Sequence, residues 1–229
     1  MDRPYPENRT PSAILRSMLC AAISLFVNGF GIYLTIQANI GTAPWDVFSL
    51  GLSHTLGILY GTASVAVSVT ILVIDLILRE PIGIAMVIDA IVVGKSVDLF
   101  NFLHLVPEAH SLLWAVPMMI LGLFIIAYTQ YTYMRSSLGC GPRDTLLVGL
   151  SRRFRRIPIG MISIALLTLV TILGALLGGP VGIGTLICAF LSGPIMQFAF
   201  RTVHFDAARI QHQHIIDSLR ILFLFLKRD

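Results

Sequence analysis

One short motif with a carboxylate at its end occurs twice in the chain. The pattern Gly-x-x-Pro-x-Asp spans 41–46 and again 139–144. Glycine allows a backbone conformation that other residues resist, and proline suits the first position of a helix, where its missing N–H costs nothing. The carboxylate then lies near the free N–H groups of the first turn, where negative charge is favoured. The motif residues are Gly41, Pro44 and Asp46 in the first copy and Gly139, Pro142 and Asp144 in the second.

Each motif predicts a short helix, over 44–57 and over 142–155, and neither is long enough to cross a bilayer. In one interpretation the two helices begin at the membrane surface, and their carboxylates only stabilise the helix ends. In the other, the helices are re-entrant, and Asp46 and Asp144 line a cavity reached from opposite faces. Irregular backbone at that depth is tolerated only where it is buried in protein or lines a cavity.

Three charged residues interrupt the apolar stretch 82–103. Lys95 and Asp98 are about one helical turn apart, close enough to form a neutralised structural pair. Asp89 has no such local partner. Ionisable residues inside a membrane are costly and mark ion or solute pathways. The candidate pathway residues are therefore Asp46, Asp144, Asp89, Lys95 and Asp98.

No enzyme or metal motif accompanies these residues. The chain lacks G-x-S-x-G, H-E-x-x-H, a Walker sequence and a Gly-rich phosphate loop. Its three cysteines, Cys20, Cys140 and Cys188, have no paired or C-x-x-C spacing, which argues against a zinc site or a disulfide framework. We therefore expect no enzymatic activity, no catalytic residue, no metal and no cofactor.

The composition predicts a membrane protein. Only 12% of the 229 residues are charged and 56% are hydrophobic, whereas soluble domains carry about a quarter charged residues. Such a chain cannot cover a water-soluble surface, so the lipid bilayer is its expected partner. The net charge of +4 comes from Lys and Arg placed between apolar stretches rather than on one basic face, which argues against a nucleic-acid partner.

Six apolar stretches are long enough to be transmembrane helices. The expected spans are 14–36, 60–78, 82–103, 112–133, 160–177 and 181–200. The predicted fold class is therefore an all-α membrane protein with six transmembrane helices and two short helices. Asp75 lies four residues before Arg79 near the end of its span, and we expect these two side chains to form an ion pair at the interface.

The positive charges predict the orientation. With six spans, every Lys and Arg except Lys95 lies on one side of the membrane. The connections on the other side hold neither residue; they are 37–59, 104–111 and 178–180. Both termini are therefore expected in the cytoplasm, with a cytoplasmic segment over 1–13. The tail 201–229 is expected to be an amphipathic helix on the cytoplasmic surface; a seventh span is the alternative, but charges interrupt it.

An internal repeat relates 14–104 to 112–200. At an offset of 98, Gly51-Leu-Ser53 recurs as Gly149-Leu-Ser151; at an offset of 99, Pro81-Ile-Gly-Ile84 recurs as Pro180-Val-Gly-Ile183. Each unit holds three spans, and this odd number places the second unit in the opposite orientation. Inverted repeats of this kind occur in secondary transporters, whose binding sites lie at the repeat interface.

The repeated motif leads into Gly-Leu, and P-x-G-I-G-T and G-P-x-x-Q follow at 180–185 and 193–197. In these features the chain is similar to the bacterial YczE/YitT-type integral membrane proteins over about 14–200. The resemblance implies a multi-pass protein of the bacterial plasma membrane whose biochemical activity is not defined. The tail is short and amphipathic, unlike the soluble C-terminal domain that YitT-type members often carry, so the chain resembles the YczE branch more closely.

Two functions are compatible with these features. The first is a transporter of a small solute or ion, with its site at the repeat interface. The second is a non-transporting scaffold or regulatory component that acts through the Arg-rich cytoplasmic loop and the tail. Because six short spans leave little room for a large cavity, a homo-oligomer is also possible in either case.

Overall fold

The computed structural model describes residues 11–205, and this part of the chain forms eight helices and no strand. The predicted tail from residue 206 on, and residues 1–10 of the expected N-terminal segment, lie outside the described residues. The helices are α1 (Pro11–Gln37), α2 (Pro44–Leu56), α3 (Tyr60–Ile77), α4 (Ile84–Phe102), α5 (Leu112–Arg135), α6 (Pro142–Arg153), α7 (Ile159–Leu176) and α8 (Ile183–Thr202).

Six of these helices are long, and each begins and ends within three residues of an expected span. Five of them, α1, α3, α5, α7 and α8, are both long and apolar enough to cross a membrane. The sixth, α4, has 19 residues and carries the three charges Asp89, Lys95 and Asp98. The described part of the chain is thus an all-helical bundle with several helices of membrane-spanning length.

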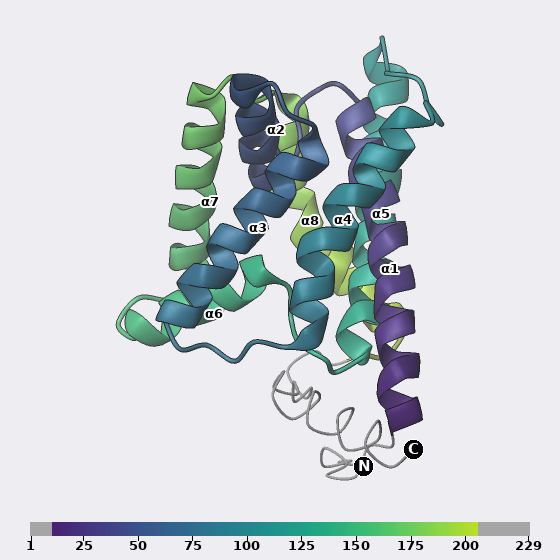
Figure 1. The fold of residues 1–229 in the computed structure, drawn as a ribbon. Helices are drawn as coiled ribbons and strands as arrows, with labels where there is room; N and C mark the ends of the chain where they lie inside the picture. The colour runs from purple at the N-terminus through teal and green to yellow at the C-terminus, as the bar shows by residue number, and fades with distance from the viewer. Residues whose placement is uncertain (1–10, 206–229) are drawn as a thin grey trace.

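The two short helices lie toward opposite ends of this bundle, α2 near the end where α7 stops and α6 near the end where α1 begins (Figure 1). Both start where the repeated motif predicts. Pro44 is the first residue of α2 and Pro142 the first of α6. The first residues of the motif, Gly41 and Gly139, have φ angles of 99° and 134°, which side chains other than hydrogen rarely tolerate.

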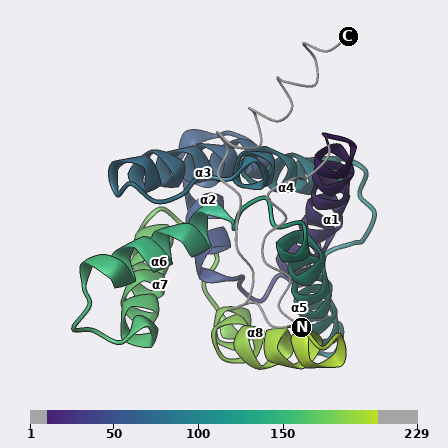
Figure 2. The same cartoon turned by 90° about the horizontal axis from the view of Figure 1, so that it is seen from below.

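The helices pack in matching pairs. α1 and α5 lie along each other, with α4 against α1 and α8 against α5, as the view from below shows (Figure 2). The short helix α2 packs on α7, and the short helix α6 packs on α3. Buried apolar side chains hold these contacts, among them Ile14, Leu25 and Tyr133 of the cluster that joins α1, α4 and α5.

One pairing is present in the first half and missing in the second. α3 packs along α4, but α7 and α8 make no comparable contact and lie apart in both views (Figures 1 and 2). The close approach of α3 to α4 depends on glycine, because a Cβ at Gly61 would lie 2.2 Å from the Gly94 carbonyl oxygen. At the matching residues of α7 and α8, Gly160 and Gly193, a Cβ would meet nothing within 4 Å. The two halves therefore have different internal packing.

Candidate functional site

The start of each short helix is anchored on the opposite half of the chain. The backbone N–H of Gly184 donates to the Ile40 carbonyl at 2.7 Å, and the N–H of Ala85 donates to the Leu138 carbonyl at 3.2 Å. Ile40 and Leu138 each precede a motif, and Ala85 and Gly184 each lie in the first turn of a long helix. These bonds fix where the first turns of α2 and α6 point.

An ion pair joins the two motifs. Arg143, between the Pro and the Asp of the second motif, places its guanidinium 3.4 Å from the Asp46 carboxylate of the first. The same guanidinium lies over the ring of Trp45, 5.5 Å from its centroid, a geometry in which cation and ring attract. The Tyr60 hydroxyl donates to Asp46 at 2.9 Å. Asp46 is 3% exposed, so its charge is compensated inside the bundle.

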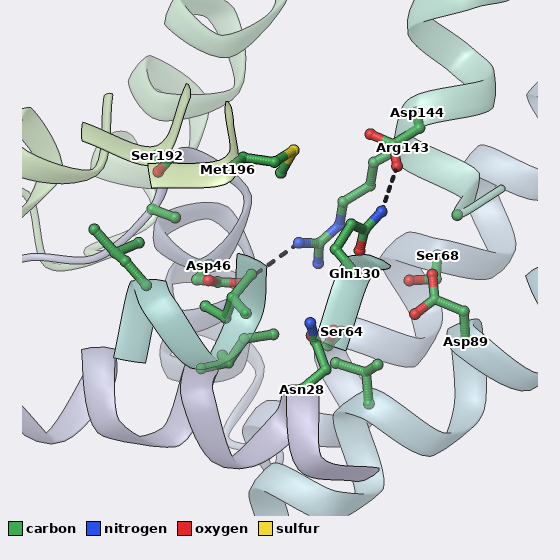
Figure 3. A pocket seen from close by; sticks show the side chains of 16 residues that line it. Asn28, Asp46, Ser64, Ser68, Asp89, Gln130, Arg143, Asp144, Ser192 and Met196 are labelled. Atoms are coloured by element: carbon green, nitrogen blue, oxygen red, sulfur yellow. Dashed lines mark hydrogen bonds and ion pairs between the residues drawn. The ribbon is translucent and has the colours of Figure 1, made fainter. Parts of the chain in front are cut away.

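A cavity of about 230 Å³ lies around this pair (Figure 3), roughly the volume of eight water molecules in the liquid. All four long helices of the central packing, α1, α4, α5 and α8, contribute to its wall, together with α3 and the starts of both short helices. Its polar lining residues are Asn28, Asp46, Ser64, Ser68, Asp89, Gln130, Arg143, Asp144 and Ser192.

Asp144 faces the cavity and is held by α5. The Gln130 side-chain amide donates to one of its carboxylate oxygens at 3.2 Å. Asp144 is an exposed residue of α6 that lines the cavity. Desolvation by the surrounding bundle raises the pKa of its carboxyl group, an effect that the nearby Arg143 charge and the Gln130 hydrogen bond oppose. Together with the Asp46 pair, this places charged groups of both motifs in the wall of one cavity.

Three of the five predicted pathway residues, Asp46, Asp89 and Asp144, line this cavity, and two do not. Lys95 lies 3.8 Å from Asp98, and its side chain is 55% exposed. Asp98 accepts a hydrogen bond from the Gly61 backbone N–H at 2.7 Å, at the first turn of α3. The Lys95–Asp98 pair thus forms on the α3–α4 side of the bundle and joins those two helices.

The predicted ion pair between Asp75 and Arg79 is wrong. No ion pair or hydrogen bond connects these side chains within residues 11–205. Asp75 is completely buried, and neither of its carboxylate oxygens has a hydrogen-bond partner there. Arg79 follows the end of α3 with a φ of 61°, which turns the chain away from the preceding helix.

Sequence reasoning missed the central cation of the site. In the sequence, Arg143 has the pattern of a topology-determining arginine, because it lies in an Arg-rich connection. Its position inside the repeated motif, matching Trp45, was the available signal. Two other cavity residues, Asn28 and Gln130, carry side-chain amides within apolar helices, and such amides form hydrogen bonds between helices. The Asn28 amide donates to the Thr129 hydroxyl at 2.9 Å.

Comparison with known proteins places these features in one family. A family described as "Family of unknown function (DUF6198)" matches residues 15–201. An uncharacterized protein of Haemophilus influenzae is 29% identical over 196 residues, which is 86% of each chain. The "Uncharacterized membrane protein YczE" of Bacillus subtilis is 30% identical over 183 residues, 76% of this chain and 81% of the relative. The "Uncharacterized protein YyaS" of the same organism is 30% identical over 177 residues, 76% of this chain and 87% of the relative. No solved structure gives a significant match.

Proposed function

This chain belongs to the DUF6198 family, whose function is unknown, and we propose that it is a transporter of a small solute or ion. The resemblance to YczE-type membrane proteins is confirmed. In the proposal, six helices span the membrane as two inverted repeats, and the substrate binds in the cavity between the two motifs. The observation that carries it is the contact of Arg143 with Asp46, since charged residues of both motif copies meet inside the bundle at one cavity.

The matching contacts support an inverted repeat. The packing of α1 against α4 in the first half corresponds to the packing of α5 against α8 in the second. In the same way, the contact of α2 with α7 corresponds to the contact of α6 with α3. The two anchoring hydrogen bonds correspond as well: the bond from Ala85 to Leu138 becomes the bond from Gly184 to Ile40 when each residue is replaced by its match in the other half. A pseudo-two-fold relation between the halves accounts for both sets. Three long helices in each unit give the reversed orientation that secondary transporters use.

The charges support a plasma-membrane orientation with cytoplasmic termini. Near the end of the bundle where α1 begins lie the described arginines of the connections and helix ends: Arg16, Arg79, Arg135, Arg152, Arg153, Arg155, Arg156 and Arg201. The opposite connections, 38–43, 57–59, 103–111 and 177–182, carry neither Lys nor Arg. Positive residues accumulate on the cytoplasmic side of membrane proteins. In this orientation α6 lies toward the cytoplasm and α2 toward the exterior.

The unequal packing of the two halves supports alternating access. In the described state α3 is closed on α4 while α7 is apart from α8. If the two repeats exchange conformations, α7 closes on α8 through Gly160 and Gly193, and α3 separates from α4. Rocking of one repeat against the other around a fixed site moves the opening of the cavity from one face to the other.

Disulfide trapping tests this proposal. The double variant Gly160→Cys with Gly193→Cys, with Cys20, Cys140 and Cys188 replaced by Ala or Ser, is oxidised in membranes with copper phenanthroline. We expect an intramolecular disulfide, because the exchanged conformation brings these positions together. The control pair Gly160→Cys with Phe190→Cys, one turn earlier on α8, is expected to react at least tenfold less. If neither pair forms a disulfide, or if both form it equally, the alternating-access proposal fails.

A further inference from the structure

Asp89 carries a carboxylate that makes no hydrogen bond to any residue in the range 11–205, although it lines the cavity. It lies in the second turn of α4. A carboxylate inside the bundle without a donor is costly unless a charge or a proton compensates it. Asp89 therefore needs a cation or a proton to compensate its charge.

Ser68 of α3 presents a second unused polar group at the same place. It is 6% exposed, lines the cavity, and donates no hydrogen bond to another described residue. Ser68 and Asp89 line the same cavity from the neighbouring helices α3 and α4, and both are labelled in Figure 3. Serine hydroxyls in membrane helices ordinarily bond back to a carbonyl of the preceding turn, as Thr70 does to Ala66 in this helix. Ser68 is thus an oxygen ligand that lines the same cavity as Asp89 and remains available.

Asp144 approaches the same space from α6. A Cβ built at Gly141 would lie 2.9 Å from an Asp89 oxygen and 3.7 Å from an Asp144 oxygen. Both carboxylates are thus within 4 Å of one point, which is free of side-chain atoms because residue 141 is glycine. Two carboxylates that share one site raise the cost of ionising each other, and a cation between them relieves that cost.

The other charged and titratable groups near Asp89 and Asp144 include a single cation. Arg143 and Asp144 of α6 and Tyr133 of α5 face Asp89, and Cys140 of the connection before α6 faces Asp144. Tyr133 and Cys140 are ordinarily neutral at pH 7. The Arg143 charge is paired with Asp46 at 3.4 Å. One cation therefore faces three carboxylates.

We infer that Asp89, Ser68 and Asp144 form a site for a monovalent cation, at which the cation and a proton compete. This inference rests on the proposed transport function and names its substrate class. Carboxylate and hydroxyl oxygens suit hard cations. No aromatic ring is among the described residues that line the cavity, which excludes the aromatic cage used for quaternary ammonium groups. When the cation enters, a proton bound to one of the two carboxylates leaves to the solvent, so one positive charge replaces another.

Proton release on cation binding tests the inference. The full chain is purified in detergent, placed in weakly buffered solution at pH 6.5 with a pH indicator dye, and titrated with NaCl or with methylammonium chloride. Tetramethylammonium chloride at equal ionic strength is the reference. We expect saturable release of up to about one proton per chain with at least one of the two cations, and the effective one distinguishes an inorganic ion from a protonated amine. Release that is absent or unsaturable with both cations overturns the inference.

Two variants and a matched control assign the release to these residues. Asp89→Asn is expected to abolish it. Asp98→Asn changes a carboxylate of the same helix that does not line the cavity, and release should stay within about a factor of two of the parent. Ser68→Ala is expected to raise the half-saturating cation concentration about fivefold. This variant tests the assignment of the site if Asp89→Asn does not fold. Parent-like release from Asp89→Asn, or an unchanged half-saturating concentration for Ser68→Ala, contradicts the assignment.

The two proposals fail separately. If the Gly160→Cys and Gly193→Cys disulfide forms but no cation releases protons, the chain still alternates and the cation site is wrong. If cations release protons but the disulfide does not form in either pair, the site exists without alternating access.

Discussion

Arg143 lies 3.4 Å from Asp46, 97 residues earlier in the chain, so the second copy of the motif binds the first. Arg143 occupies the position that Trp45 has in the other copy. The residue that follows the helix-starting proline of one motif thereby reaches the aspartate of the other. This contact holds the starts of two short helices together inside the bundle.

The first prediction concerns this pair. Arg143→Gln leaves Asp46 buried with only the Tyr60 hydrogen bond, and we expect a loss of up to about 3–5 kcal/mol in the free energy of unfolding. The loss should fall toward the lower end, because the Arg143 side chain is 26% exposed. Asp46→Asn and the double variant complete a cycle measured by detergent-induced unfolding. The double variant should lose clearly less than the sum of the single variants; strictly additive losses would show that the two charges do not interact.

The second prediction concerns the hydroxyl that supports Asp46. Tyr60→Phe removes a hydrogen bond of 2.9 Å to a carboxylate. Hydrogen bonds to charged groups contribute about 1.5–3 kcal/mol in soluble proteins, but side-chain bonds in membrane helices average about 0.6 kcal/mol. We therefore expect a loss of about 1 kcal/mol, measured in the same unfolding assay. Tyr131→Phe is the control, because the Tyr131 hydroxyl only accepts from the exposed Arg135; equal losses in both variants would contradict the role of Tyr60.

The third prediction compares matching glycines of the two repeats. Gly61→Ala places a methyl group 2.2 Å from the Gly94 carbonyl oxygen, whereas Gly160→Ala places one in open space. Overpacking a close contact costs about 1–3 kcal/mol, so Gly61→Ala should lower the melting temperature by several degrees and Gly160→Ala should not lower it. A reversed order would mean that the closed half of the bundle is α7–α8 under the conditions of the measurement.

The fourth prediction concerns Asp75. Its carboxylate is fully buried and has no hydrogen-bond partner within residues 11–205. Removing an uncompensated buried charge relieves a desolvation penalty. Asp75→Asn is therefore expected to raise the melting temperature of the purified protein by a few degrees. Asp98→Asn, whose carboxylate has both Lys95 and the Gly61 N–H as partners, should leave it equal or lower. A destabilised Asp75→Asn would reveal a partner for this carboxylate.

Much of the fold follows from the sequence. Hydropathy and the Gly-Pro punctuation place the long helices within three residues, because apolar length and helix-breaking residues act locally. The short helices start at Pro44 and Pro142 for the same reason. The side of α4 that Asp89, Lys95 and Asp98 occupy could not be predicted, since it depends on how α4 packs against α3.

The candidate site followed from the sequence only in part. The repeat singled out Asp46 and Asp144, and charge inside an apolar stretch singled out Asp89. Arg143 was hidden, because an arginine in an Arg-rich connection between apolar helices already has an explanation in membrane topology. Its long side chain reaches Asp46 across the cavity only when both short helices point inward, and that is a property of tertiary packing.

The central claim is that the two short helices enter the bundle from opposite sides of the membrane. Single cysteines test it at exposed positions beyond the site, Leu56→Cys at the end of α2 and Phe154→Cys after the end of α6, in a chain without its native cysteines. Cells are treated with a membrane-impermeant maleimide before and after permeabilisation. Our account predicts that Leu56→Cys is labelled in intact cells and Phe154→Cys only after permeabilisation. Labelling of both from the same side would contradict it.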